Sequence, residues 1–64
     1  MSGPIWRRIA AGRYTDGRGW EVRRMAPGAW SVLKWDEERA GWLMVMDRLP
    51  SKTRAMALAD RLRR

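Results

Sequence analysis

The sequence contains neither cysteine nor histidine. Without cysteine the chain can form no disulfide and no thiolate nucleophile, and without histidine it has no imidazole base for a catalytic triad. The cysteine and histidine ligands of a typical zinc site are missing as well. No nucleophile with a positioned base can be named among the residues that remain. We therefore expect no metal, no cofactor and no enzymatic activity.

The sequence also lacks a long apolar segment, since no run approaches the ~18 residues of a membrane-spanning helix. The absence of cysteine is compatible with a reducing compartment. Together these features favour a cytoplasmic protein without a membrane partner. The acidic cluster Asp36-Glu37-Glu38 lies between predicted strands and has no further ligand nearby. We interpret it as a solvated turn and not as a cation site.

Basic residues are present in clear excess. The 64 residues include 14 lysines and arginines against 7 aspartates and glutamates, which gives a formal net charge of +7. Residues 1–24 carry a net charge of +4, residues 25–47 a net −2 and residues 48–64 a net +5. A polyanionic partner would therefore meet the two ends of the chain first. Five tryptophans supply the apolar area that the core of so short a chain needs.

Strand-length runs of Trp, Val, Leu and Met predict an antiparallel meander. Asp16-Gly17 and Pro27-Gly28 are typical of tight turns, because glycine adopts the positive φ that such turns require. The strands are expected at residues 20–25, 30–36 and 42–49, with a weaker candidate at residues 6–14.

The last part of the chain predicts a helix. Ser51 follows Pro50 as an N-cap, and small or apolar residues then recur at the spacing of one helical face. These residues are Ala55, Leu58, Ala59 and Leu62. We therefore expect a single α+β domain over residues 1–64, in which an antiparallel three- to four-stranded meander sheet packs on one C-terminal α-helix. Its parts are a flexible lead-in (1–5), the strands (6–49) and the helix (51–63).

The apolar pattern also predicts the register of the sheet. We expect Ala26 to face Ala29 across the Pro27-Gly28 turn and Trp35 to face Trp42 in the next hairpin. The resulting pairs are Val22 with Leu33, Trp20 with Trp35, Glu21 with Lys34, Leu33 with Met44 and Ser31 with Met46. The face that the helix covers would hold Trp20, Val22, Leu33, Trp35, Trp42, Met44 and Met46. The open face would hold Glu21, Arg23, Met25, Trp30, Val32, Lys34, Leu43, Val45 and Asp47.

Basic and aromatic residues are the candidate nucleic-acid contacts. Side chains of the open face can reach base edges, sugars or unpaired bases, and cations in the first helical turn can join free N–H groups in binding phosphate. The predicted contacts are Arg13, Arg18, Arg23, Trp30, Lys34, Lys52 and Arg54. Simpler interpretations stay open: the face can be a dimer interface or be covered by the N-terminal segment, and the loop and helix start can be solvated turns.

Two segments resemble a known family of DNA-binding modules. Gly28-Ala29-Trp30-Ser31-Val32 is similar to the Gly-x-Trp strand opening of that family, and the segment from Leu49 to Ala59 is similar to its passage from the third strand into an Ala-rich helix. The family comprises the DNA-binding domain of plant ethylene-response factors and the arm-binding domain of phage tyrosine integrases. The resemblance covers roughly residues 20–62. It implies a sheet laid into the DNA major groove, with Arg23, Trp30 and Lys34 in contact with DNA.

Two functions follow as alternatives. The first is a small basic nucleic-acid-binding module, with DNA favoured over RNA, of the kind that a phage or another mobile element encodes. The second is a protein-interaction module or an inhibitor of a host nucleic-acid enzyme, which would use the apolar part of the open face. The sequence favours the first function and is compatible with either a monomer or a homodimer.

Overall fold

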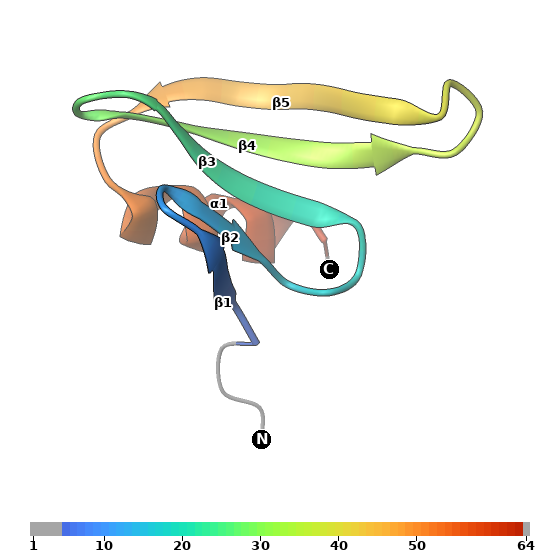
Figure 1. Ribbon diagram of the computed structural model, residues 1–64, viewed down its shortest axis with the longest axis horizontal. Coiled ribbons are helices and arrows are strands. Elements are labelled where there is room, and N and C mark those ends of the chain that lie inside the picture. Colours follow the sequence, from blue (N-terminus) through green and yellow to red (C-terminus); the bar gives the residue numbers. More distant parts are fainter. Residues whose placement is uncertain (1–4, 64) are drawn as a thin grey trace.

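The computed structural model describes residues 5–63, which form one antiparallel sheet and one helix (Figure 1). The sheet has the strand order β1-β2-β3-β4-β5, so sequential strands are neighbours. The elements are β1 (Arg7–Ala10), β2 (Arg13–Thr15), β3 (Trp20–Ala26), β4 (Ala29–Asp36), β5 (Gly41–Leu49) and α1 (Lys52–Leu62). The predicted α+β meander with a C-terminal helix is confirmed, but it has five strands where three or four were expected. Residues 1–4 of the expected lead-in lie outside the described residues.

The segment predicted as one weak strand supplies the additional strand, because it folds into the β1–β2 hairpin. The chain reverses at Ala11-Gly12, where Gly12 adopts a φ of 69° that other residues rarely tolerate. The Gly12 carbonyl accepts a 2.8 Å hydrogen bond from the backbone N–H of Arg24, and a Cβ at Gly12 would lie only 3.3 Å from the Cβ of Arg24. Glycine thus permits both the turn and the close approach of the hairpin to β3.

The helix packs on β3 and β4 through its alanines. Ala55 and Ala59 are fully buried and form the core together with Trp20, Val22 and Val32. Alanine side chains let the helix axis approach the sheet closely, so the bulk of the core comes from the strands. Ser51 caps the helix as expected, since its hydroxyl oxygen accepts the backbone N–H of Arg54 at 3.2 Å.

The β2–β3 loop ties the sheet to the end of the helix. Asp16 is buried, and one carboxylate oxygen accepts the backbone N–H groups of Arg18 (2.7 Å) and Trp20 (3.1 Å). Its other oxygen forms an ion pair with Arg63, which also pairs with Asp60 on α1. The Asp-Gly segment is therefore a hairpin turn, as predicted, here between β2 and β3, and it also anchors the C-terminal end of α1.

The predicted register of the β3–β4 hairpin is correct at the turn and wrong beyond it. Ala26 does face Ala29, but a bulge between Arg24 and Ala26 leaves Met25 unpaired. The pairs are consequently Trp20 with Lys34, Glu21 with Leu33 and Val22 with Val32. Because successive side chains alternate between faces, this shift by one residue moves every side chain of β4 to the face opposite the predicted one.

The β4–β5 hairpin pairs Trp35 with Trp42 and Leu33 with Met44, as predicted. A second bulge then places Met46 opposite Val32, so the predicted pair of Ser31 with Met46 is wrong. Of the set that the helix was expected to cover, only Trp20 and Val22 belong to the core cluster that contains the helix alanines, and Leu33 is buried on the other face. The face turned away from α1, here called the outer face, holds Glu21, Arg23, Leu33, Trp35, Trp42 and Met44.

Candidate nucleic-acid interface

The structure divides the predicted contact residues between two faces of the sheet. Arg13 and Arg23 are partners across β2 and β3 on the outer face. Trp30 and Lys34 lie on the helix side, with Lys52 at the start of α1. Arg18 lies in the β2–β3 loop, and Arg54 is exposed in the first turn of α1. The expectation that Arg23 and Lys34 share a face is wrong, because the bulge at Met25 separates them.

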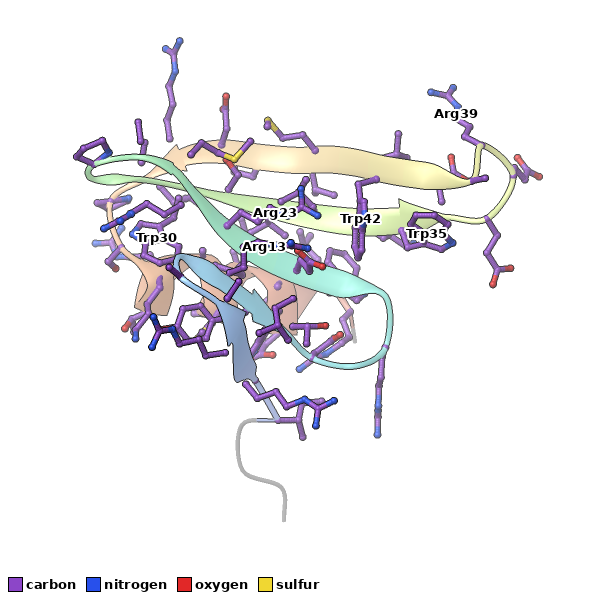
Figure 2. All side chains as sticks on the ribbon, viewed as in Figure 1. Arg13, Arg23, Trp30, Trp35, Arg39 and Trp42 are labelled. Carbon is purple, nitrogen blue, oxygen red and sulfur yellow. The ribbon has the colours of Figure 1, made fainter. Side chains whose placement is uncertain are left out.

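The outer-face arginines are bound to a buried carboxylate. Glu21 is only 4 % exposed, and its two oxygens each accept a 3.1 Å hydrogen bond from Nη2 of Arg13. One of these oxygens also accepts Nε of Arg23 at 2.7 Å. The Arg23 guanidinium lies 5.4 Å from the centre of the Trp42 ring, which meets Trp35 edge-on with ring centres 5.4 Å apart (Figure 2). These contacts hold both guanidinium groups in place, and the negative charge of Glu21 neutralises one of their two positive charges.

A different group of cations surrounds a cleft at the other side of the sheet. The cleft has a volume of about 640 Å³ and lies between the β1–β2 hairpin, the β3–β4 turn and the start of α1. Three of its lining residues are cations and two are aromatic, and no acidic residue lines it. We call it the basic cleft, and its chemistry-bearing residues are Arg8, Arg24, Lys52, Tyr14 and Trp30.

Among residues 5–63, the cations of the basic cleft have no carboxylate partners. None of the five ion pairs found among residues 5–63 involves Arg8, Arg24 or Lys52. Nor does the first turn of α1 hold an acidic residue, although the partial positive charge of a helix N-terminus favours one there. The cleft therefore concentrates positive potential that no carboxylate of residues 5–63 neutralises.

Tyr14 lies in contact with the cations of the basic cleft. Its hydroxyl accepts a 2.9 Å hydrogen bond from Nζ of Lys52, which also lies 4.6 Å from the centre of the Tyr14 ring. This hydrogen bond, with the charges of Lys52 and Arg8, lowers the pKa of Tyr14 below its ordinary value. The Tyr14 ring lies 6.1 Å from that of Trp30, so two aromatic groups form one wall of the cleft.

Sequence reasoning missed Arg8, Tyr14 and Arg24. Residues 6–14 were expected as one weak strand and not as the β1–β2 hairpin, so Arg8 and Tyr14 were not assigned to a face of the sheet. Arg24 follows Arg23 directly, and only the pairing of Arg24 with Trp30 shows which of the two faces the helix side. The signal that could have found the cleft is Gly12, because a glycine between two short β-compatible segments predicts a turn.

A second hollow, of about 720 Å³, lies at the opposite end of β4 and carries both signs of charge. It is lined by Arg18 and Lys34 together with the acidic turn Asp36-Glu37-Glu38. The turn is structured as predicted: a carboxylate oxygen of Asp36 accepts the backbone N–H of Glu38 at 3.0 Å. Within residues 5–63, no group of three potential ligands could hold a metal ion. The mixed charge suits a polyanion poorly.

Comparisons with protein-family models, with curated protein sequences and with solved structures found no match. The resemblance to the ethylene-response-factor and integrase modules therefore remains a prediction. None of the helices in the described part of the chain is long and apolar enough to cross a bilayer.

Proposed function

We propose that this protein binds nucleic acid and that the phosphodiester backbone occupies the basic cleft. The observation that carries the proposal is the convergence of Arg8, Arg24 and Lys52 on a cleft without a single acidic lining residue. A protein gains nothing in stability from gathering like charges, because they repel one another. A ligand with closely spaced negative charges turns that unfavourable arrangement into binding free energy.

The distribution of ion pairs supports the cleft over the outer face. Arg13 and Arg23 already share Glu21, so a phosphate would have to compete with a buried carboxylate for them. The cleft cations face no such competitor among the described residues. The resemblance implies contacts from Arg23 on the outer face and from Trp30 and Lys34 on the helix side, so it selects neither face. The local charge favours phosphate contacts on the helix side.

The two aromatic residues of the basic cleft, Tyr14 and Trp30, can contact the sugars and bases of a nucleic acid in addition to its phosphates. Trp30 is half-buried beside Tyr14, so an indole edge or face remains for a sugar or an unstacked base. Base stacking on aromatic side chains tolerates any sequence. We therefore expect binding with modest sequence preference, and DNA is the first ligand to test because the resembling family binds DNA.

The experiment is an anisotropy titration of labelled single-stranded and duplex oligonucleotides at several salt concentrations. Three phosphate contacts predict a slope of log K against log salt of about −2 to −3. The double variant Arg24→Gln/Lys52→Gln should weaken binding by at least about tenfold and reduce this slope by about 2. The matched control Arg39→Gln/Arg61→Gln removes the same charge from exposed positions outside the cleft. Equal losses in both double variants, or binding that ignores salt, would contradict the proposal.

A further inference from the structure

Trp30 differs from the other tryptophans in its surroundings. Among residues 5–63 it is the only tryptophan that lines the basic cleft, and Figure 2 shows it at the opposite end of the sheet from Trp35 and Trp42. Three other tryptophan rings have a cation within 5.6 Å of their centres, supplied by Arg63, Lys34 and Arg23. Among the described residues no cation lies over the Trp30 ring in this way, although three cations line the same cleft. Because Trp30 is only half-buried, part of its aromatic surface remains available to a ligand.

Arg24 and Trp30 place a cation and an aromatic ring next to each other. They are direct partners across β3 and β4, and the Cβ atoms of such partners lie about 4.5–5.5 Å apart. One nucleotide spans this separation when its phosphate meets the cation and its base meets the ring. Lys52, which the Tyr14 hydroxyl holds in place, and Arg8 line the same cleft and can contact a neighbouring phosphate.

The size of the basic cleft suits an extruded nucleotide and not a double helix. Its volume of about 640 Å³ lies within the range of about 300–1,000 Å³ that is typical of small-ligand sites. In a duplex each base is paired and stacked on its neighbours, so bringing one to Trp30 costs the free energy of unstacking it. The bases of a single strand can turn outward and stack on an aromatic side chain. Only a single strand therefore uses the cations and the indole of the cleft together without this cost.

We infer that the basic cleft binds single-stranded nucleic acid, with one unpaired base against Trp30 and the adjacent phosphates at Arg24, Lys52 and Arg8. The inference rests on the proposed function, which places phosphates in the cleft without choosing between single strand and duplex. It differs from the binding in a duplex groove that the resemblance implies. Trp30 carries no charge, so it selects the form of the strand, whereas the cations supply the salt-dependent part of the affinity.

Salt should sharpen the preference for a single strand. Each phosphate contact contributes about −0.9 to the slope of log K against log salt for a duplex and about −0.7 for a single strand. Binding to a duplex therefore weakens faster as salt is added, and stacking of a base on Trp30 is not screened. We expect the ratio of single-strand to duplex affinity to rise with salt concentration.

The first test uses the wild-type chain and three labelled ligands of equal backbone length in anisotropy titrations. They are an oligothymidylate, the same strand with an abasic sugar at every position, and a duplex of mixed sequence. Stacking of a base on an aromatic side chain is worth roughly 5- to 100-fold in affinity. The oligothymidylate should bind more tightly than the abasic strand by this factor, with the same salt slope. It should also bind more tightly than the duplex, by a margin that grows with salt.

The second test removes the ring from the cleft. Trp30→Leu keeps an apolar side chain and should weaken binding of the oligothymidylate by roughly 5- to 100-fold, while the abasic strand and the duplex keep their affinities within a few-fold. Trp35→Leu is the matched control, because Trp35 is 39 % exposed on the outer face and does not line the cleft. Its affinities for all three ligands should stay close to those of the wild type. Circular dichroism of both variants checks that the sheet is intact.

The outcomes separate the inference from the proposed function. Equal affinity for the oligothymidylate and the abasic strand, or a duplex that binds more tightly at every salt concentration, would overturn the inference. The proposed function would stand in both cases, because the phosphate contacts would still produce the salt slope. Equal losses in Trp30→Leu and Trp35→Leu would also overturn the inference. If none of the three ligands showed salt-dependent binding, the proposed function would fail and the inference with it.

Discussion

Replacing Arg54 with glutamate should stabilise the protein. Ser51 is the N-cap of α1, and Arg54 occupies the third helical position, where its backbone N–H is already bound by the Ser51 hydroxyl. A glutamate at this position can reach back to the backbone N–H of Ser51 and complete a capping box. It also places a negative charge in a first turn that contains no acidic residue. Both effects favour the folded state.

The expected magnitude follows from two charge changes. Removing a cation from the first turn and adding an anion there are each worth roughly 0.3–1 kcal/mol. We expect a gain of about 1 kcal/mol, which raises the Tm of a domain of this size by about 4–8 °C. Arg54→Gln is the matched control, because glutamine can also accept the Ser51 N–H but carries no charge. It should deliver about half of the gain.

Thermal unfolding of the three proteins at low and high salt provides the assay. The charge-dependent part of the gain should shrink at high salt, while the hydrogen-bonded part persists. If glutamate and glutamine raise the Tm equally at low salt, the helix dipole contributes nothing here. If neither raises it, the first turn of α1 is not arranged as described. Arg54 lies beside the basic cleft without lining it, so glutamate should weaken nucleic-acid binding less than loss of Arg24 does.

Two further predictions concern the site residues. Lys52→Ala should raise the pKa of Tyr14, which absorbance of the tyrosinate can follow because Tyr14 is the only tyrosine. Since folding lowers this pKa, the Tyr14 group should add stability as pH rises through its folded-state pKa, and that gain should vanish in Lys52→Ala. Glu21→Gln should cost about 1–3 kcal/mol in urea unfolding, because the half-buried Arg23 loses its charged acceptor; an unchanged midpoint would show that the carboxylate is dispensable.

Features encoded by local pattern could be predicted from the sequence. The three long strands, the Ala26–Ala29 turn, the Trp35–Trp42 pair and the Ser51 cap each depend on residues close together in the chain. The alternation of apolar and polar residues, the residue preferences of turns and helix capping all act between residues close together in the chain. These elements could therefore be recognised from the sequence.

The two bulges and the β1–β2 hairpin could not be predicted in this way. Met25 has no conformational preference that marks it as an unpaired residue, yet its exclusion from the ladder exchanges the faces of β4. The hairpin depends on contacts that are distant in sequence, chiefly the hydrogen bond from Arg24 to Gly12 and the bond from the Trp6 indole to Asp60. Tertiary contacts of this kind outweigh the weak strand propensity of Ala10, whereas Ala11 lies in the turn.

Alternation along β3 gives the adjacent residues Arg23 and Arg24 different surroundings. Arg23 lies on the outer face, where it forms an ion pair with Glu21 and lies over the Trp42 ring. Its contacts therefore stabilise the sheet. Arg24 lies on the helix side, where it lines the basic cleft together with Arg8 and Lys52, so it adds to the positive potential of the cleft. The arginines of the outer face are thus paired with Glu21, whereas the cations of the basic cleft have no carboxylate partner among the described residues. At the end of the sheet that holds the β3–β4 turn they remain unpaired, whereas the acidic turn lies at the other end (Figure 1). The end of β4 that holds the β3–β4 turn is therefore the end that would meet the polyanion that we propose as the ligand.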